Sequence, residues 1–473
     1  MVELAGVLVA GSPFLVAGVA LLGFGWSAFR TGLAALSAAI LGAVLWPPLS
    51  GSGVLPAVLG SVGTSWDVVF VLFGGLLLYR LLASGPGDGQ VGAVSRFLGS
   101  VEPERAILAV AVVVGAGAFF ESVTGFGVAV VICAPILLAA GFSPIKAAVL
   151  AMWSQCAVPW GALGVGTVIG ADLSGLTFAR LSDLSALLNL PLFPVYAGAS
   201  LLLAGGLEAL RRHGVEALML GLAAGFGTLA TSLFVAPELS GAVGGAVALG
   251  VFLLRRRVRL REVGVPVRAV VPYGFLVAGI IAVSTLSGAL PERIAGVISG
   301  PGLPLFATSA FAVALLGLRP DDVEAALRKT VAQWLPTAGS IVVFVAAGQV
   351  VAVCGGAAVL AGFAAKSGAF YPVAASLVGG VGGALTGSNA ASNALFMPFQ
   401  SEAARNLGDG AGLIAAVQNV SGSHASMLAP QRIVLAAAAV GLTGSEGELI
   451  RRALPPVAIS IFILAGVALL FSP

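Results

Sequence analysis

The segment GALTGSNAASNALF, residues 383–396, lies between two long apolar stretches and contains few large hydrophobic side chains. Its threonine, serine and asparagine side chains compete for backbone hydrogen bonds, and its glycines allow backbone angles that other residues avoid. This composition predicts a break in a helix. The flanking stretches, however, have the composition of a membrane interior, so the break requires an explanation other than a surface loop.

The rest of the chain has the composition of a membrane protein. Of its 473 residues, 59% are hydrophobic and 9% are charged, with a mean hydropathy of +1.07, whereas soluble domains carry about 25% charged residues. Apolar blocks close to the ~20 residues of a spanning helix recur throughout, and the alternating strands of a membrane barrel are not seen. We therefore predict an all-α, polytopic protein of the cell membrane, in contact with the lipid bilayer.

Charge is concentrated in short connecting segments. The strongest cluster is RRRVRLRE at 255–262, and a second flexible connector covers 84–104. Both are typical of cytoplasmic loops under the positive-inside rule, which places the N-terminus outside. A lipid-headgroup or regulatory site is the alternative for 255–262. The N-terminal block lacks a basic n-region and a clear cleavage site, which favours a retained first span over a signal peptide. We expect no nucleic-acid partner.

Several chemical motifs are absent from the sequence. It has no GxxxxGK[ST] nucleotide-binding loop, no HExxH and no CxxC. Cys133, Cys156 and Cys354 lie in apolar context and are interpreted as packing residues. The sequence thus disfavours an ATP-driven pump and a membrane enzyme, and we predict neither a cofactor nor a metal site.

A second segment resembles the first. GAGAFFESVTGFG (115–127) and LVGGVGGALTGSN (377–389) both place Thr-Gly after a glycine-rich apolar helix, and a glutamine follows 31 residues after the first threonine and 32 after the second. We predict two inverted repeats, 1–235 and 266–473, joined by a basic connector at 236–265 that includes part of a span. Broken helices are expected at 121–127 and 386–393, related by a pseudo-twofold axis near the membrane midplane, with further breaks at Gln155 and Gln418.

Matched breaks have a physical meaning in a membrane. An unpaired backbone group in hydrocarbon costs several kcal/mol, so irregular backbone survives only where it lines a cavity. Paired broken helices are typical of a transporter's binding site, and their N-termini suit an anion. Close helix packing by small residues is the alternative. The predicted ligand-facing residues are Ser122, Thr124, Gly125, Gln155, Thr386, Gly387, Ser388, Asn389, Ser392, Asn393, Gln418, Asn419 and Ser421.

Three ionisable residues complete the predicted site. Glu121 lies inside an apolar run, where a carboxylate is costly and by default a functional candidate; burial favours its protonated form, so it could load and release a proton. A structural helix-end cap is the alternative. His424 is a second candidate for proton coupling or a structural hydrogen-bonding residue. Arg432 could bind a substrate carboxylate or extend to the membrane interface.

Three stretches resemble one known family. GAFFESVTGFGVAVVICAPILLAAGFSPIKAAVL, GSNAASNALF and QNVSGSHASMLAPQRIVLAAAAVGLTGSEGEL are similar to dense blocks of the L-lactate permease family, secondary transporters that carry lactate and glycolate with protons. The resemblance covers most of the chain. It implies two inverted repeats, each with a re-entrant hairpin that meets the other near the midplane. Asn389 stands where the resemblance implies an acidic residue, and Ser426 where it implies a lysine.

The sequence therefore predicts a secondary active transporter of a small monocarboxylate, such as lactate, glycolate or a similar 2-hydroxy acid, with proton symport and alternating access. A cation/proton antiporter with Glu121 as its ion site, or a transporter of another small organic anion, is the alternative. A channel or structural membrane protein is a third possibility, but a channel would show polar stripes along whole helices. We expect Ser388, Asn389, Ser392 and Asn393 to face one cavity, with a helix restarting near Ser392.

Overall fold

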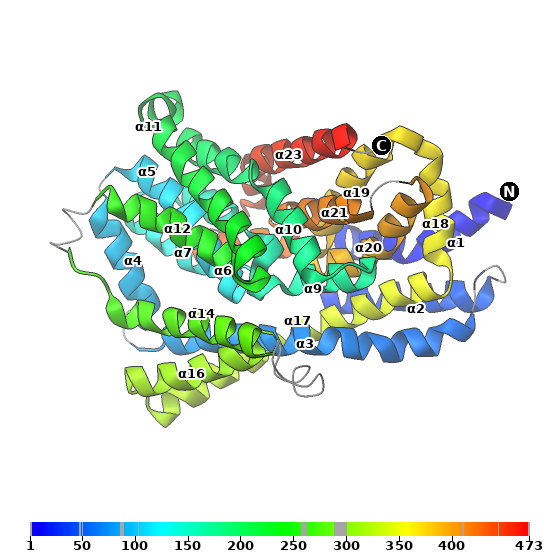
Figure 1. Cartoon of the computed structure of the whole chain (residues 1–473), viewed down its shortest axis with the longest axis horizontal. Helices are drawn as coiled ribbons and strands as arrows, with labels where there is room; N and C mark the ends of the chain where they lie inside the picture. Colours follow the sequence, from blue (N-terminus) through cyan, green and yellow to red (C-terminus); the bar gives the residue numbers. More distant parts are fainter. Residues whose placement is uncertain are drawn as a thin grey trace.

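The described part of the chain is helical. The computed structural model describes residues 2–46, 49, 51–85, 89–102, 104–256, 263–287, 300–408, 411–442 and 444–471, and all regular elements in these ranges are helices (Figure 1). Ten of these described helices, or runs of joined helices, are long and apolar enough to cross a membrane. The prediction of an all-α, multi-pass membrane protein is confirmed. Residues 257–262 of the basic cluster lie outside the described residues.

Long helices form one side of the molecule. Helix α17 packs along α3 and α2, and α16 packs against α3 and α14. Apolar side chains such as Leu45, Phe462 and Leu470 are 70–79% exposed on outer helices, as expected for surfaces that face lipid. These elements are α1 (Val2–Gly18), η1 (Val19–Gly23), α2 (Ala28–Leu45), η2 (Gly51–Gly53), α3 (Val54–Leu82), α14 (Val267–Ser287), α16 (Gly302–Leu316) and α17 (Pro320–Val353).

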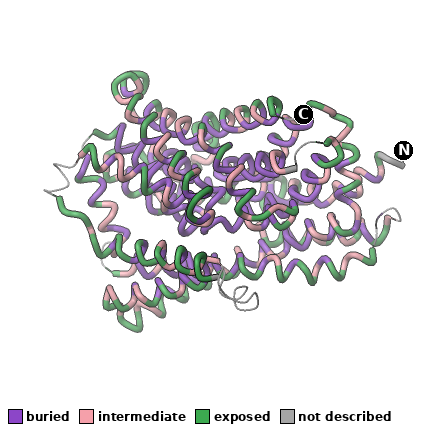
Figure 2. The backbone as a smooth tube through the Cα atoms, viewed as in Figure 1, coloured by how far each residue is buried: buried purple, intermediate pink, exposed green. Residues whose placement is uncertain are grey.

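The centre of the molecule is formed mainly by shorter helices that follow one another end to end, and the 43-residue α11 is the long exception among the elements named below. The run 105–124 is 94% buried, whereas the other candidate spans are at most 61% buried, so this run is the central one (Figure 2). The first half contributes α4 (Gly89–Val101), α5 (Arg105–Val110), η4 (Ala111–Gly117), α6 (Ala118–Thr124), α7 (Val128–Ala139), α8 (Pro144–Trp153), η5 (Val158–Trp160), α9 (Gly161–Ser174), α10 (Phe178–Asn189), α11 (Leu192–Phe234), η6 (Pro237–Leu239) and α12 (Ser240–Leu254).

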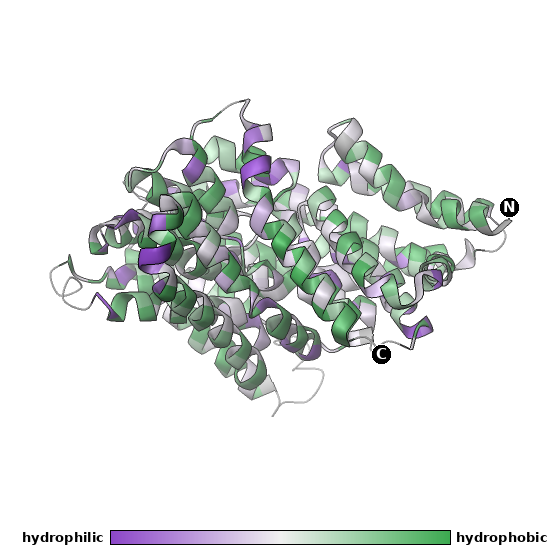
Figure 3. Cartoon of the chain, turned by 90° about the horizontal axis from the view of Figure 1, so that it is seen from above, coloured by the Kyte–Doolittle hydropathy of each residue, from purple (hydrophilic) through white to green (hydrophobic). Residues whose placement is uncertain are grey.

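The second half contributes a similar series of short helices. Helices α6 to α9 and helices α19 to α22 both follow the order helix, break, helix, connection, helix, break, helix. Hydrophilic segments gather mainly toward the end of the molecule away from the N-terminus (Figure 3). The elements are α18 (Gly356–Ala364), η7 (Ala365–Phe370), α19 (Tyr371–Thr386), α20 (Asn389–Asn406), α21 (Ala411–Ser426), α22 (Pro430–Ala439) and α23 (Glu446–Phe471).

Both predicted Thr-Gly breaks exist, but they are shorter than predicted. The first covers 125–127, because 121–124 form the last turn of α6. In the second, only Gly387 (φ 64°) and Ser388 leave the helix. Ser388 caps α20 by accepting a hydrogen bond from the backbone N–H of Ala391 (3.4 Å), so the helix restarts at Asn389 and not near Ser392. The prediction that 389–393 are non-helical is therefore wrong, and the segment 394–404 belongs to the same helix.

The two predicted glutamine breaks have different outcomes. Helix α8 ends at Trp153, and the backbone leaves the helix at 154–157, at the predicted position. The predicted break at Gln418 is wrong, because α21 continues through it to Ser426. The chain breaks instead at 427–429, just before Pro430, which favours the first turn of a new helix because proline has no backbone N–H to pair.

Close packing between α17 and α20 gives a stability prediction. A methyl group on Gly348 would lie 1.7 Å from the carbonyl oxygen of Ala394, a backbone atom that cannot move aside. Gly348→Ala should therefore destabilise the protein by about 1–3 kcal/mol or more. Gly63→Ala, on α3 with nothing within 4 Å, should be neutral or stabilising by up to about 1 kcal/mol. Thermal unfolding of both variants in detergent measures the difference; equal melting temperatures would contradict the packing.

Candidate functional site

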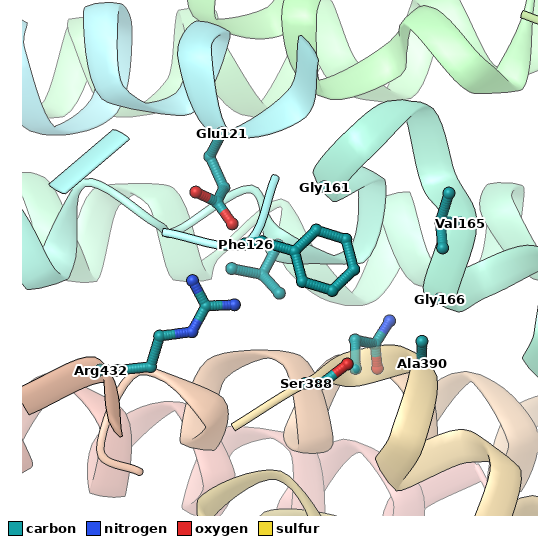
Figure 4. A pocket seen from close by; sticks show the side chains of 10 residues that line it. Glu121, Phe126, Gly161, Val165, Gly166, Ser388, Ala390 and Arg432 are labelled. Carbon is teal, nitrogen blue, oxygen red and sulfur yellow. The ribbon is translucent and has the colours of Figure 1, made fainter. Parts of the chain in front are cut away.

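A small cavity lies where the broken helices meet. Its volume is about 20 Å³, which is room for roughly one water molecule. One wall comes from α6, the 125–127 break and α9, and the facing wall comes from the starts of α20 and α22 (Figure 4). The lining residues are Glu121, Phe126, Val158, Gly161, Val165, Gly166, Ser388, Asn389, Ala390 and Arg432.

Backbone strain is concentrated beside this cavity. Among described residues, the non-glycine residues with positive φ are Phe126 (52°), Ala162 (50°) and Leu163 (58°). A methyl group on Gly125 would lie 2.7 Å from the nitrogen of Ala162, so the two strained segments pack directly on each other. Left-handed geometry costs roughly 1–2 kcal/mol per residue and, where the surroundings hold it, is concentrated at functional sites.

Glu121 is buried in the last turn of α6. Its side chain is 1% exposed, and its Oε2 atom has no hydrogen-bond partner in the described part of the chain. The backbone N–H groups of Gly127 and Ala129, at the start of α7, are directed at the carboxylate. The first break therefore supplies helix-terminal dipoles that stabilise the negative charge. Figure 4 shows the side chain pointing into the space that Arg432 enters from the opposite side.

Arg432 lies in the first turn of α22 and is 5% exposed. Its Nε atom donates a hydrogen bond to the carbonyl oxygen of Gly387 (3.1 Å), whereas Nη1 has no partner among the described residues. The neighbouring Gln431 donates to the carbonyl oxygen of Thr386 (2.6 Å). The start of α22 thus pairs the carbonyl groups that the second break leaves free. Arg432 is directed into the protein, not toward the membrane interface.

The two charges face each other without touching. Glu121 and Arg432 interact electrostatically. Their nitrogen and oxygen atoms do not approach within 4.0 Å, however, so the ion pairs between described residues do not include this one. A methyl group on Gly127 would lie 2.3 Å from Nη1 of Arg432, so the guanidinium rests against the first break. The site carries one positive and one negative charge, each with an unpartnered atom.

An asparagine network lies beside the cavity and joins the two halves of the chain. Oδ1 of Asn419 accepts hydrogen bonds from Asn389 and Asn393 (both 2.8 Å), and its Nδ2 donates to Thr167 (3.1 Å) and Ser185 (2.8 Å). Within the ranges that the structure describes, Oδ1 of Asn389 and Oδ1 of Asn393 have no hydrogen-bond partner. Of the two, Asn389 lines the cavity, whereas Asn393 donates to the carbonyl oxygen of Gly166 (2.9 Å) and packs against α9.

Other predicted residues form a glutamine network away from the cavity. Nε2 of Gln418 donates to Ser392 (3.1 Å), and its Oε1 accepts from Gln400 (2.7 Å). The hydroxyl of Tyr371 donates to Gln400 (2.9 Å). Because Ser392 and Gln418 pair with each other inside the α19–α20–α21 packing and neither lines the cavity, the expectation that Ser392 and Asn393 share a cavity with Ser388 and Asn389 is wrong for this structure.

His424 is also paired internally. Its two ring nitrogens lie 2.9 Å from the hydroxyl of Tyr196 and 2.5 Å from Oδ1 of Asn189. Asn189 in turn donates to the carbonyl oxygen of Cys156 (3.3 Å), in the 154–157 break. His424 is fully buried and is not a lining residue. It thus connects α21, α10 and α11 to the irregular backbone that follows α8.

The remaining predicted residues are directed at their own helices or at packing surfaces. The hydroxyls of Thr124 and Thr386 donate to carbonyl oxygens one turn earlier (2.6 and 2.8 Å). Gln155 donates to Met152 (3.1 Å). Ser122 lies against Gly241 and Ser421 against Gly379. The structure thus brings four predicted side chains to the cavity: Glu121, Ser388, Asn389 and Arg432.

Sequence reasoning missed the α9 side of the cavity. Its lining residues Val158, Gly161, Val165 and Gly166 are small or apolar, and a methyl group on Gly166 would lie 2.7 Å from Asn389. The glycine spacing in PWGALGVG (159–166) was the available signal. Of the network partners that were missed, Thr167 and Tyr196 are isolated polar residues in apolar surroundings, whereas Ser185 and Asn189 lie in α10 among other polar residues and form no distinct motif.

The sequence of this chain matches one family of known proteins. Residues 6–291 and 294–472 match the family model described as L-lactate permease. The chain belongs to the L-lactate permease family. The resemblance predicted from its three sequence blocks is confirmed, and membership indicates a transporter rather than an enzyme.

Named relatives are similar over most of their length. The L-lactate permease of Streptococcus iniae is 25% identical over 75% of this chain and 81% of that protein. The L-lactate permease and the glycolate permease GlcA of Escherichia coli strain K12 are 23% and 24% identical, each over 82% of this chain and 81% of the relative. A solved structure of Neisseria gonorrhoeae MtrF, presented as illuminating a class of antimetabolite efflux pumps, has a TM-score of 0.49 and 15% identity over 89% of this chain and 83% of that chain.

The contact between Gly127 and Arg432 gives a prediction for this permease. Gly127→Ala should displace the guanidinium, weakening ligand binding about tenfold or more, the value of one charged hydrogen bond. Gly175→Ala is the matched control: its φ of 74° resembles the 82° of Gly127, but nothing lies within 4 Å. Lactate binding, measured by isothermal titration, should weaken in Gly127→Ala but not in Gly175→Ala. Equal effects would mean that backbone strain, not the position of Arg432, controls the site.

Proposed function

We propose that this permease is a secondary active transporter that moves a small 2-hydroxy monocarboxylate, such as lactate or glycolate, together with a proton. The observation that carries the proposal is the buried pair Glu121 and Arg432, which face each other across a cavity between two broken helices without forming an ion pair. The similarity to relatives named as L-lactate permease and glycolate permease supports the substrate class.

Arg432 is the proposed binding group for the substrate carboxylate. Its Nη1 atom is buried and unpartnered, while Nε is held by Gly387, so the side chain is oriented before the substrate arrives. The N-terminus of α20, an 18-residue helix, also faces the cavity through Ser388 and Ala390. A guanidinium and a helix N-terminus together favour a carboxylate.

Charge balance explains the proposed proton coupling. With Glu121 ionised and Arg432 positive, the empty site has no net charge. A bound carboxylate would leave one uncompensated negative charge in a buried, poorly screened cavity, which is costly. Protonation of Glu121 restores neutrality, so the anion and the proton should bind together. The site is then neutral both when empty and when loaded, which suits a site that opens alternately to the two sides of a membrane.

The same charges argue against the alternative of a cation/proton antiporter. A metal cation at Glu121 would lie beside the guanidinium of Arg432, and the two positive charges would repel each other. His424 was also a candidate for proton coupling, but both of its ring nitrogens are engaged by Tyr196 and Asn189. We therefore assign the proton to Glu121 and a structural role to His424.

Transport requires the cavity to enlarge. About 20 Å³ is too small for lactate, which has six non-hydrogen atoms, so the two walls must separate. One wall belongs to α6, the 125–127 break and α9, and the other to the starts of α20 and α22. We infer that these walls belong to two inverted repeats, 1–235 and 266–473, that move against each other by alternating access. The repeated order of helices α6–α9 and α19–α22 supports this division.

The coupling model makes a prediction for Glu121→Gln. The amide preserves shape but cannot titrate, so lactate exchange should persist, whereas accumulation driven by an inward proton gradient should be lost. In the unmodified protein the loaded site holds one more proton than the empty site, so lactate affinity should fall as pH rises, by up to about tenfold per pH unit. In Glu121→Gln the affinity should not depend on pH.

Uptake of labelled lactate into proteoliposomes with and without the proton gradient tests the expected loss of accumulation. The same uptake measured over a range of pH tests the expected pH dependence of lactate affinity. If the glutamine variant still accumulates lactate against its concentration gradient, Glu121 does not carry the proton.

Substrate selectivity gives a second prediction, in which two asparagines are compared. The unpartnered Oδ1 of Asn389 lies at the cavity and can accept the 2-hydroxyl proton, so Asn389→Ala should weaken lactate binding more than propionate binding. A buried polar group without a partner costs about 1–3 kcal/mol, which corresponds to roughly fivefold to more than a hundredfold in affinity. Asn393→Ala should affect both acids equally, because Asn393 supports α9. If Asn393→Ala narrows the difference in affinity between lactate and propionate and Asn389→Ala does not, Asn393 and not Asn389 contacts the 2-hydroxyl group.

A further inference from the structure

We propose that a pocket between the start of α5 and the bend in α11 binds the phosphoethanolamine headgroup of a membrane lipid. The pocket has a volume of about 410 Å³ and is separate from the cavity at Glu121, with which it shares no lining residue. Its lining residues are Glu104, Arg105, Ala106, Ala204, Gly205, Glu208, Ala209, Arg212 and His213.

The bend in α11 places this pocket at the membrane surface. A straight helix of 43 residues would be about 65 Å long, roughly twice the thickness of the hydrocarbon layer. Gly206, with φ 69° and ψ −160°, interrupts the helix, and the carbonyl group of Ala204 before it accepts a hydrogen bond from Lys146 (3.4 Å). The charged residues at 208–213 that follow would be too costly within hydrocarbon. Figure 1 shows this part of α11 projecting at one end of the molecule, beside α5.

Apolar side chains next to the pocket face outward. Leu202, before the bend, is 43% exposed, and Leu207, just after it, is 66% exposed. Both therefore lie where acyl chains would contact the protein, while the charged lining lies at headgroup level. A lipid would contact both the charged lining, with its headgroup, and the exposed leucines, with its acyl chains. A soluble ligand would contact only the charged lining.

The charges in the pocket are unpaired and of both signs. Glu208 and Arg212 are one helical turn apart, a spacing that permits an ion pair, yet none of the ion pairs between described residues involves them. Glu104 likewise forms none, and Arg105 donates to the carbonyl oxygen of Gly141 (3.1 Å). A ligand that carries a phosphate and an ammonium group would match Arg105 and Arg212 with one end, and Glu104 and Glu208 with the other.

This charge arrangement distinguishes among common headgroups. The ammonium of phosphatidylethanolamine offers three N–H donors to the carboxylates, as a lysine does. The trimethylammonium of phosphatidylcholine offers none. Phosphatidylglycerol has no cationic group and would leave the carboxylates unneutralised. The geometry therefore favours phosphatidylethanolamine over both other lipids.

Lipid binding to the purified, delipidated permease tests the proposal by native mass spectrometry. Phosphatidylethanolamine should bind about tenfold more tightly than phosphatidylcholine, the effect of losing charged hydrogen bonds. Glu208→Gln/Arg212→Gln should remove this preference. Glu324→Gln/Arg328→Gln is the matched control, because it neutralises an exposed pair at the same spacing on α17 (2.9 Å) and should change nothing.

A single substitution and a soluble competitor complete the test. Glu208→Gln alone should weaken phosphatidylethanolamine binding but should not weaken phosphatidylglycerol binding, and this selective loss cannot arise from misfolding. Free phosphoethanolamine should compete poorly, because it lacks acyl chains. Equal binding of the three lipids, an unaffected double variant, or competition by free phosphoethanolamine as effective as that of the lipid would overturn the proposal.

Discussion

The structure depends on keeping a carboxylate and a guanidinium in the same buried space. Removing either charge from water costs several kcal/mol, and backbone groups of the broken helices offset part of that cost. Amides at the start of α7 are directed at Glu121, and the carbonyl oxygen of Gly387 accepts from Arg432. The buried charges and the free backbone groups at the helix breaks therefore stabilise each other. Without the charges, the free backbone groups would be unpaired in an apolar interior; without the breaks, the charges would lack partners.

Glycine and asparagine bring the two walls together. Glycine allows the positive φ angles at Gly127 and Gly387, and it leaves room on α9 for the asparagines of α20. Asn419 then joins α20 and α21 to α9 and α10 through neutral hydrogen bonds. Neutral bonds of this kind contribute roughly 1 kcal/mol each. A wall held by several such bonds would stay ordered, yet could exchange hydrogen-bond partners during the cavity opening that we propose.

Two different uses of charge appear in one chain. At the centre, a single carboxylate and a single guanidinium are buried, oriented and balanced, so that any added charge must be compensated. At the bend of α11, charges of both signs line a larger surface pocket and form no ion pair with one another or with other described residues. In the two binding proposals made above, the first arrangement selects a ligand by its net charge, and the second selects a ligand by the positions of two opposite charges. The difference follows from depth, because water and headgroups screen the surface pocket but not the central cavity.

The sequence by itself determined the fold class, the membrane location, the two Thr-Gly breaks, and the candidacy of Glu121 and Arg432. Each of these follows from local composition or from the cost of burying a charge. Only the tertiary structure decided that the helix restarts at Asn389, that α21 runs unbroken through Gln418, and that Ser392 and Asn393 lie outside the cavity. A cap hydrogen bond determines where a helix begins, and the side chains that face the cavity depend on which helix of the other half packs against them. Such contacts join residues more than 200 positions apart, as from Asn393 to Gly166, and leave no local pattern in the sequence.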